Sequence, residues 1–397
     1  MLQNDYTTKL LGLEEAEVIK IEEREGYDEI HIKLRKREHT CPKCGEKTEK
    51  THDYRWQKVK DLTVFGKNIL LYLKKRRYVC IRCGKRFAED VSFLPKYHRV
   101  TSRLISHVLS SLGGLRPFKD VALEHRISPT TAMRYFKLVN YKCKSLPEVL
   151  SIDEFRGNAG GERFQCILAD PKNRKVLDIL PNRKQETLMK YFHGFSTKNN
   201  VKYFVMDMNR SFLEIAAACF PRATVVIDRY HVVRQVLWDF EKVRRTLQQE
   251  LSEQRRKYFK RSRKLLLKRP DKLKPDEVNQ VEVMLRLSPR LAEAYHLKNR
   301  FLEFMHSESR EEAAQRLKTW VLMAECANIP EFRSSLTAIH NWDRYILNAF
   351  ACPYTNGFTE GCNNKIKVLK RISFGVRNFP RFRNRILHIM NSKTVSS

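Results

Sequence analysis

Residues 149–155 (VLSIDEF) and 201–207 (VKYFVMD) are the stretches that decide the fold. Each is a short apolar run rich in β-branched and aromatic residues, a composition that favours a β-strand. Each also carries an aspartate at or near its end, Asp153 and Asp207. A chain with 77 Lys and Arg against 45 Asp and Glu has little reason to keep carboxylates there unless a cation binds. The two aspartates therefore mark a candidate cation site.

Between the two stretches and just beyond them, strand-like and helical patterns follow one another in the order β-β-β-α-β-α-β. The strands are expected at residues 149–155, 164–170, 175–180, 201–206 and 224–227, and the helices at 185–195 and 210–220. This α/β order is the one used by ribonuclease-H-like folds, in which the first and fourth strands of a mixed sheet are neighbours. Adjacent strands lie about 4.8 Å apart, so the two carboxylates would stand side by side and repel. Mg²⁺ or Mn²⁺, which prefer oxygen ligands, would relieve that repulsion.

A third acidic residue, Glu360, stands in the segment TNGFTEGCNNKIK. A helix is expected over residues 359–371, and Glu360 falls in its first turn, where the helix dipole favours an anion. If this helix packs on the sheet, Glu360 completes a metal-binding set with Asp153 and Asp207. A structural role stays open for each residue: a strand-end turn for Asp153, a helix cap for Asp207 and a helix-terminal charge for Glu360.

Two further features lie beyond the fifth expected strand. Asp228 ends that strand in the segment DRYH, and His231 follows three residues later. The aspartate could orient the imidazole for contact with a phosphate or leaving group, or the pair could be a structural hydrogen bond; neither residue is taken as a metal ligand. Residues 232–350 read as a mostly helical insertion, in which Trp238, Trp320 and Trp342 are expected in the core.

Four cysteines near the N-terminus form two CxxC pairs, Cys41 with Cys44 and Cys80 with Cys83. Each pair can place two thiolates on one tight turn, and structural zinc takes four ligands in a tetrahedron. The pattern predicts a zinc ribbon. The alternative is a chance pairing of buried cysteines.

Residues 101–140 have a helical pattern that is typical of a helix-turn-helix. Ser128 is a plausible N-cap and Pro129 suits the first helical position. On the second helix Thr130, Thr131 and Arg134 would be exposed to DNA. Simple helix packing without a reading role is the alternative.

The net charge of +32 indicates a polyanionic partner, because basic side chains release counterions from a phosphate backbone. No apolar run is long enough to suggest a membrane span, and the first residues do not read as a secretory signal; an intracellular, cytoplasmic location is expected. Besides the helix-turn-helix residues, the expected DNA contacts are Lys74, Lys75, Arg76, Arg77, Lys365, Lys367, Lys370, Arg371 and Arg377.

Taken together, these motifs resemble the DDE-type transposases of bacterial insertion sequences, specifically the ISL-three group. The resemblance rests on CPKC, CIRCGKRF, SIDEF, VMDMNRSF, VIDRYHVVRQV and the segment TNGFTEGCNNKIKVLKRISFGVRNFPRFRNRI. It implies a ribonuclease-H-like catalytic core with a helical insertion and Asp153, Asp207 and Glu360 as its metal-binding triad. The expected domains are a zinc ribbon (1–95), a helix-turn-helix domain (96–145), the first part of the core (146–231), the insertion (232–350), and the final glutamate helix with a basic tail (351–397).

The function that follows is divalent-metal-dependent cleavage of double-stranded DNA at the ends of an insertion sequence, and strand transfer into target DNA. A homodimer or larger assembly on DNA is expected, because two ends must be brought together. Two alternatives stay open: a zinc-dependent DNA-binding regulator, and a nuclease of the same fold that does not join strands.

Overall fold

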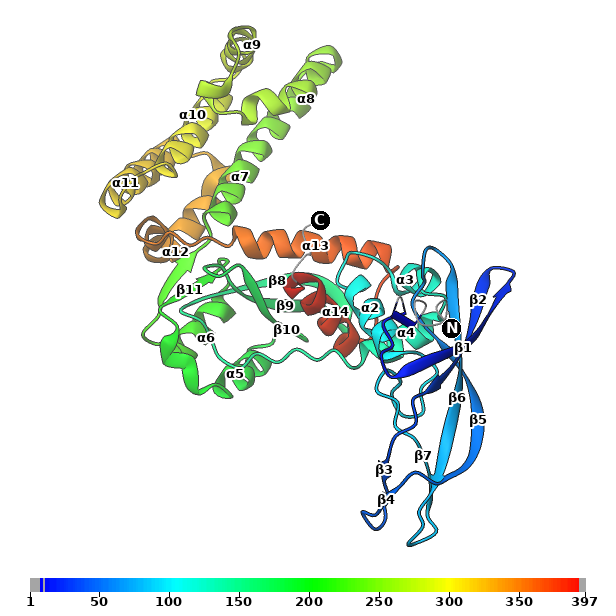
Figure 1. The fold of residues 1–397 in the computed structure, drawn as a ribbon. Helices are drawn as coiled ribbons and strands as arrows, with labels where there is room; N and C mark the ends of the chain where they lie inside the picture. Colours follow the sequence, from blue (N-terminus) through cyan, green and yellow to red (C-terminus); the bar gives the residue numbers. More distant parts are fainter. Residues whose placement is uncertain (1–7, 10, 393–397) are drawn as a thin grey trace. The chain divides into compact units, whose positions relative to one another are not determined.

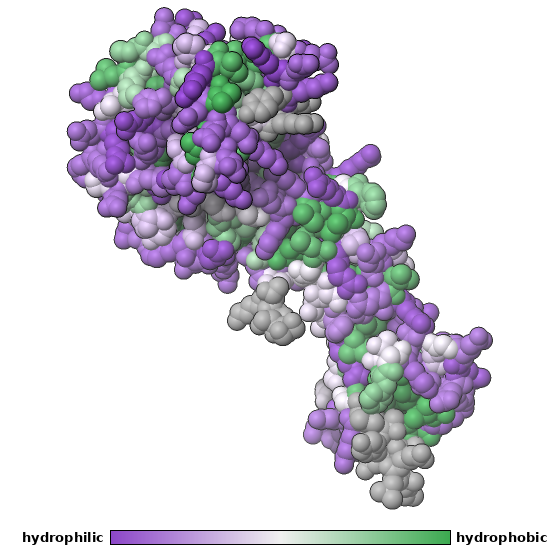
Figure 2. Space-filling view, turned by 90° about the horizontal axis from the view of Figure 1, so that it is seen from above, coloured by the Kyte–Doolittle hydropathy of each residue, from purple (hydrophilic) through white to green (hydrophobic). Residues whose placement is uncertain are grey.

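The computed structural model describes residues 8–9 and 11–392 of the chain. They form two compact units, one made of the residues up to Asn140 together with Ser392, and one of residues Tyr141–Asn391. Hydrophilic side chains cover most of the surface visible in Figure 2, as the high content of charged residues requires. Within the described ranges, no helix has the length and apolar character needed to cross a membrane.

The first unit is built on a mixed sheet of order β1-β2-β6-β5, with β7 paired to one end of β6 (Figure 1). Its hydrophobic face carries Ile30, Ile32, Leu71 and Leu73, which recur at every second residue as a half-buried sheet requires. The strands are β1 (Ala16–Arg24), β2 (Tyr27–Leu34), β5 (Thr51–Lys60), β6 (Asn68–Val79) and β7 (Arg86–Ala88), and a separate hairpin joins β3 (His39–Thr40) and β4 (Lys47–Thr48).

The helices α2 (Ser102–Ser111), α3 (Phe118–Glu124) and α4 (Pro129–Phe136) follow this sheet along the chain. Ser128 caps α4, since its Oγ accepts the N–H of Thr131 at 3.1 Å, and Pro129 takes the first helical position. The expected cap and helix pair are therefore confirmed. Thr130 and Arg134 are exposed on α4, and Thr131 is half-buried.

The second unit contains a five-stranded sheet of order β10-β9-β8-β11-β12. β8, β9 and β10 are antiparallel, β11 runs parallel to β8, and β12 runs parallel to β11. The expected topology is thus confirmed, including the adjacency of the first and fourth strands. The strands are β8 (Val149–Ala159), β9 (Glu162–Asp170), β10 (Lys175–Leu180), β11 (Tyr203–Met206) and β12 (Thr224–Ile227).

Helices cover both faces of this sheet. One face, with Leu150, Ile152 and Phe204, packs in the same core as α5 (Gln185–His193) and α6 (Arg210–Cys219). The opposite face packs with α13 (Gly357–Ile372) and α14 (Phe379–Asn391), and Figure 1 draws α13 alongside β8. Because side chains alternate along a strand, residues two apart, such as Ser151 and Asp153, share the second face.

The insertion is helical, as expected. Its helices are α7 (Arg229–Glu250), α8 (Glu253–Leu267), α9 (Pro275–Arg286), α10 (Pro289–Phe304), α11 (Arg310–Ala327) and α12 (Arg333–Ala351), with short 3₁₀ turns between some of them. Trp320 is buried in its core and Trp342 is partly buried against it. The expectation for Trp238 was wrong: the residue is 56% exposed, because the apolar stripe of α7 lies on the other side of that helix.

Candidate metal centre and nucleic-acid interface

Strand register brings three carboxylates to one level of the second sheet. Val205 of β11 pairs with Ser151 of β8 and with Val226 of β12. Each of these residues is followed two positions later by an aspartate: Val205 by Asp207, Ser151 by Asp153 and Val226 by Asp228. Side-chain alternation keeps all three on the face of the sheet that packs with α13, and adjacent strands are about 4.8 Å apart. The structure therefore brings Asp153 and Asp207 together and adds Asp228 to the same row.

The row is electrostatically strained without a cation. Burial, followed by the charge of Asp207, raises the pKa of Asp153 to about 7. Burial also raises the pKa of Asp228, with a further contribution from Asp207. Two buried carboxylates near one another cannot both ionise without a large cost in free energy. Bound protons or a metal ion must therefore neutralise the charge of this row.

Helix α13 is fixed along β8 by polar contacts. From residue 151 to 156 the strand advances about 16.5 Å, and from 359 to 370 the helix also advances about 16.5 Å. The two elements thus run side by side in the same direction. Three contacts at matching levels join them: Ser151 Oγ with Thr359 Oγ1 at 2.7 Å, Asn363 Nδ2 donating to Asp153 Oδ2 at 2.7 Å, and Lys370 Nζ donating to the carbonyl of Arg156.

The helical period then determines where Glu360 points. Cys362 and Leu369 pack toward β9, β10 and α14 in one apolar cluster. Glu360 lies nine residues before Leu369, which is about half a turn round the helix at 3.6 residues per turn. Its side chain therefore leaves α13 on the opposite flank, toward β11 and β12. In agreement, the charge of Glu360 contributes to the raised pKa of Asp228.

The donor set fits a hard divalent cation. The ligand atoms of Asp207, Asp228 and His231 all lie within 4.8 Å of one another. Asn363 Oδ1 is buried beside Asp153 and has no hydrogen-bond partner in the described part of the chain. Carboxylate and amide oxygens are ligands of Mg²⁺ and Mn²⁺. Of the predicted triad only Asp207 belongs to the 4.8 Å group that the described residues form; Asp153 and Glu360 are outside it.

His231 stands between the acidic row and a guanidinium. Its Nε2 lies 3.0 Å from Asp207 Oδ1, and its Nδ1 accepts a hydrogen bond from Arg234 Nη2 at 2.9 Å. Burial favours the neutral imidazole, but the contact with Asp207 raises the pKa of His231 overall. The nearer partner of His231 is thus Asp207, since Asp228 Oδ2 lies 3.9 Å from the same nitrogen.

Three other acids near the sheet have structural partners. Glu154 accepts a hydrogen bond from Arg183 at 2.7 Å, at the edge of a hollow that Asp207, His231 and Arg234 also line. Two more are bound to their neighbours: Asp170 accepts from the backbone and side chain of Asn173, and Asp178 from Arg383 and Tyr191.

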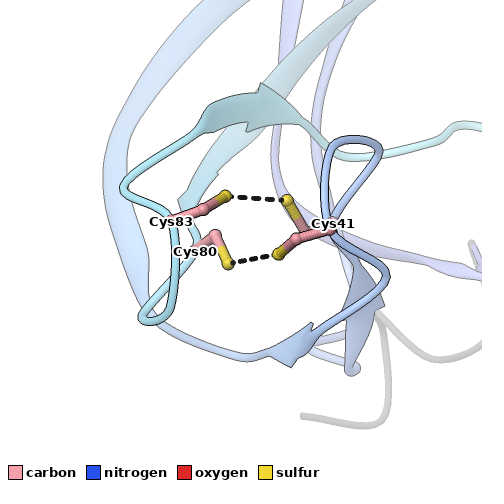
Figure 3. A group of neighbouring side chains, drawn as sticks. Cys41, Cys80 and Cys83 are labelled. Atoms are coloured by element: carbon pink, nitrogen blue, oxygen red, sulfur yellow. Dashed lines mark hydrogen bonds between the residues drawn. The ribbon is translucent and has the colours of Figure 1, made fainter.

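The four cysteines of the first unit converge on one point (Figure 3). Cys41 Sγ lies 3.6 Å from Cys83 Sγ, and Cys44 Sγ lies 3.5 Å from Cys80 Sγ. Ligands 2.3 Å from a tetrahedral zinc ion are about 3.8 Å apart, so the observed spacing suits that ion. Although burial opposes it, the backbone N–H groups of Lys43 and Cys44 lower the pKa of Cys41 to about 6. The group fits structural zinc.

The two cysteine turns share one backbone design. In each turn the residue after the second cysteine is a glycine with positive φ, Gly45 at 73° and Gly84 at 67°. Its N–H donates to the carbonyl of the first cysteine, Cys41 or Cys80, at 3.0 Å in both turns. Glycine adopts this backbone conformation without a steric penalty, which explains the CxxCG pattern.

The basic residues expected at DNA have different surroundings. The expectation that Arg76 contacts DNA is corrected. Arg76 is only 6% exposed, forms an ion pair with Glu89 and donates to the carbonyl of Leu34, so it supports the fold. Lys370 is held by the Arg156 carbonyl. The exposed or half-exposed members are Lys74, Lys75, Arg77, Lys365, Lys367, Arg371 and Arg377.

Exposed aromatic residues beside this basic run had not been expected. Lys74 lies over the ring of Tyr54, with its Nζ 4.7 Å from the ring centroid, and 5.9 Å from that of Trp56. Tyr54 and Trp56 are about half exposed. A sequence pattern could have predicted this exposed aromatic face. Tyr54 and Trp56 both occupy even-numbered positions of residues 51–60, and alternate residues of a half-buried strand lie on one face.

Comparison with known proteins finds three family models along the chain. A family model described as "Transposase" matches residues 150–386. A second, described as "zinc-finger of transposase IS204/IS1001/IS1096/IS1165", matches residues 37–83. A third, described as "Helix-turn-helix domain of transposase family ISL3", matches residues 89–140.

Individual relatives agree with these matches. The chain is 28% identical over 363 residues to the transposase for insertion sequence element IS1001 of Bordetella parapertussis, a match that covers 88% of each chain. It is 24% identical over 241 residues to the transposase for insertion sequence element IS1557 of Mycobacterium tuberculosis, which covers 54% of each chain.

Proposed function

We propose, from the premise that this chain belongs to the ISL3 family of DDE transposases, that Asp153, Asp207 and Glu360 form its site for cutting and joining DNA. The observation that carries the proposal is the level row of Asp153 and Asp207, beside a helix that Asn363 attaches to Asp153. Asp228 belongs to the same row and shares its charge.

The catalytic metal is proposed to be Mg²⁺ or Mn²⁺, held by carboxylate oxygens of the row and of Glu360. When bound, such ions neutralise charge on the phosphate and activate the attacking oxygen. Protein side chains position the carboxylates: Asn363 orients Asp153, and His231 places an N–H beside Asp207. Cleavage by water and attack by a 3′-hydroxyl are both in-line displacements at phosphorus, so one site can serve both.

The first unit is proposed to bind the ends of the insertion sequence. Thr130, Thr131 and Arg134 stand on the second helix of a helix-turn-helix, the helix that enters the major groove in this motif. Zinc held by four thiolates would keep the two cysteine turns together. Because transposition joins two ends, we propose a homodimer or larger assembly on DNA, acting at the bacterial nucleoid.

Substitution of the acids tests the site. Asp153→Asn, Asp207→Asn and Glu360→Gln each remove one charge with little change of shape. Each should abolish strand cleavage of an end-containing duplex in Mg²⁺ or Mn²⁺, while DNA affinity measured without divalent ions stays within a fewfold of wild type. Retained cleavage in all three variants would overturn the assignment.

A joining assay tests the second half of the reaction. Precut ends that carry a free 3′-hydroxyl should be inserted into a target plasmid by the wild-type protein and not by the three variants. Hydrolysis of ends without any joined product would instead favour a nuclease.

A further inference from the structure

A row of side chains on the first turns of α7 is left unexplained by packing. Tyr230, Arg234 and Trp238 are spaced four residues apart and therefore share one face of the helix. The buried residues Val232 and Val236 lie about 200° round the helix from Tyr230 and Arg234, so the row faces away from the core. Tyr230 is 49% exposed and Trp238 56%.

The three side chains form a stacked ladder. The guanidinium carbon of Arg234 lies 5.7 Å from the ring centroid of Tyr230 and 5.1 Å from that of Trp238. Arg234 is fixed from the side, because its Nη2 donates to His231 Nδ1 at 2.9 Å. Two exposed aromatic side chains clustered with an arginine form a candidate interaction surface.

The ladder begins at the acidic row. Tyr230 precedes His231, whose Nε2 lies 3.0 Å from Asp207 Oδ1. His231 and Arg234 also line the hollow that contains Asp207. From Tyr230 to Trp238 the helix advances about 12 Å, so bases that stack on the two rings would be about three or four steps of 3.4 Å apart along one strand.

We propose that the Tyr230–Arg234–Trp238 ladder binds unpaired nucleobases of the DNA strand whose phosphate lies at the acidic row. This inference rests on the proposed function and names a part of its substrate. The faces of bases inside a duplex are covered by their neighbours, so only bases that have left the helix can stack on protein rings. The ladder offers one ring at each end, and Arg234 between the rings carries the charge that suits the neighbouring phosphates.

The test is a binding measurement without divalent ions, so its outcome does not depend on cleavage. The probe is a short duplex with a single-stranded extension that contains 2-aminopurine, whose fluorescence falls when it stacks. Wild-type protein should bind this probe more tightly than the blunt duplex and quench it. Trp238→Ala and Tyr230→Ala should each weaken binding to the extended probe by about 5- to 150-fold per stacked base lost, and leave blunt-duplex affinity unchanged.

Two control variants complete the design. Trp238→Phe keeps a ring and should restore most of the preference for the extended probe. Leu322→Ala removes a side chain of α11 that is 54% exposed, close to the exposure of Trp238, and should have no effect. An RNA extension in place of DNA shows whether the sugar contributes; tighter binding of RNA than of DNA would contradict the proposed ligand.

The failures of the two proposals can be told apart. If Trp238→Ala and Tyr230→Ala keep the full preference and quenching, the ladder does not stack bases, whatever the acids do. If Trp238→Ala changes only the oligomeric mass of the protein, the ladder is a contact between copies of this chain, and the inference is also overturned. The Asp153→Asn, Asp207→Asn and Glu360→Gln variants should all keep the preference; cleavage by all three would contradict the proposed function alone.

Discussion

Replacing Asn363 with leucine tests how α13 controls the acidic row. The side chain of Asn363 donates to Asp153 Oδ2 at 2.7 Å, and both residues are buried. Leucine has a similar size but no N–H, so Asn363→Leu removes this hydrogen bond without opening a large cavity. A hydrogen bond to a charged group contributes about 1.5–3 kcal/mol, which at about 1.4 kcal/mol per pKa unit should raise the pKa of Asp153 by about one to two units.

The starting value makes this change measurable. The pKa of Asp153 is already raised to about 7, first by burial and then by the charge of Asp207. At pH 7 about half of the wild-type side chains are then ionised, against about 1–10% in Asn363→Leu. Since a metal ion binds the carboxylate and not the acid, the affinity for Mn²⁺ at pH 7 should fall by about 5- to 50-fold. The deficit should shrink as the pH rises toward 9, where the variant also ionises.

Calorimetric titration with Mn²⁺ between pH 6.5 and pH 9 measures the effect on protein without DNA. Asn364→Leu is the matched control, because Asn364 is the next residue of α13 and is exposed; its Mn²⁺ affinity should equal that of wild type at each pH. Equal affinities of wild type and Asn363→Leu throughout the range would refute the reasoning. A deficit that stays constant with pH would show that Asn363 places Asp153 without affecting its ionisation.

Three further outcomes are expected. Cys41→Ser should lose its bound zinc, measured by metal analysis of the purified protein, and unchanged zinc content would contradict the four-thiolate site. Arg76→Ala should destabilise the first unit by about 3–5 kcal/mol, because it leaves Glu89 buried without its ion-pair partner, whereas Lys74→Ala should weaken DNA binding with little loss of stability in thermal unfolding. Burial lowers the pKa of Lys298 to about 7; the unfolded chain therefore binds the extra proton above pH 7. Wild type should gain stability over Lys298→Met as the pH rises from 7 toward 10, by up to about 1.4 kcal/mol per pH unit in urea unfolding, and parallel pH profiles would contradict this.

The order of strands was predictable because it depends on local patterns. Apolar runs of four to eight residues separated by turns and helices give the sequence of elements, and a known topology then makes β8 and β11 neighbours. The same period-2 signal was present in residues 27–34, where Ile30, Ile32 and Leu34 alternate with polar residues. It could have predicted β2, and with it the larger sheet of the first unit. The many charged residues in this part of the chain obscured the period-2 signal.

Features that depend on distant partners could not be predicted. Arg76 stands in a run of four basic residues, and only the structure shows that it is buried in contact with Glu89, the residue that follows β7. The contact between Asn363 and Asp153 joins residues 210 positions apart. The exposure of Trp238 is different, because the apolar stripe of Val232 and Val236 already placed it on the outer face of α7. For Trp238 the helical period was enough to predict exposure. The prediction was wrong because it followed the usual burial of tryptophan and not the period of α7.

One helix serves two opposite electrostatic needs. Lys367 and Arg371 follow Glu360 by seven and eleven residues, so both lie on the same flank of α13 as Glu360, each within about 20° of it. Lys367 and Arg371 are exposed. Seven residues span about 10.5 Å along the helix, close to the distance of about 10 Å over which 0.1 M salt screens a charge. A DNA backbone held at the two basic residues is therefore largely insulated from the repulsion of the acidic row. For this reason DNA affinity should survive neutralisation of an acid, whereas metal binding should not.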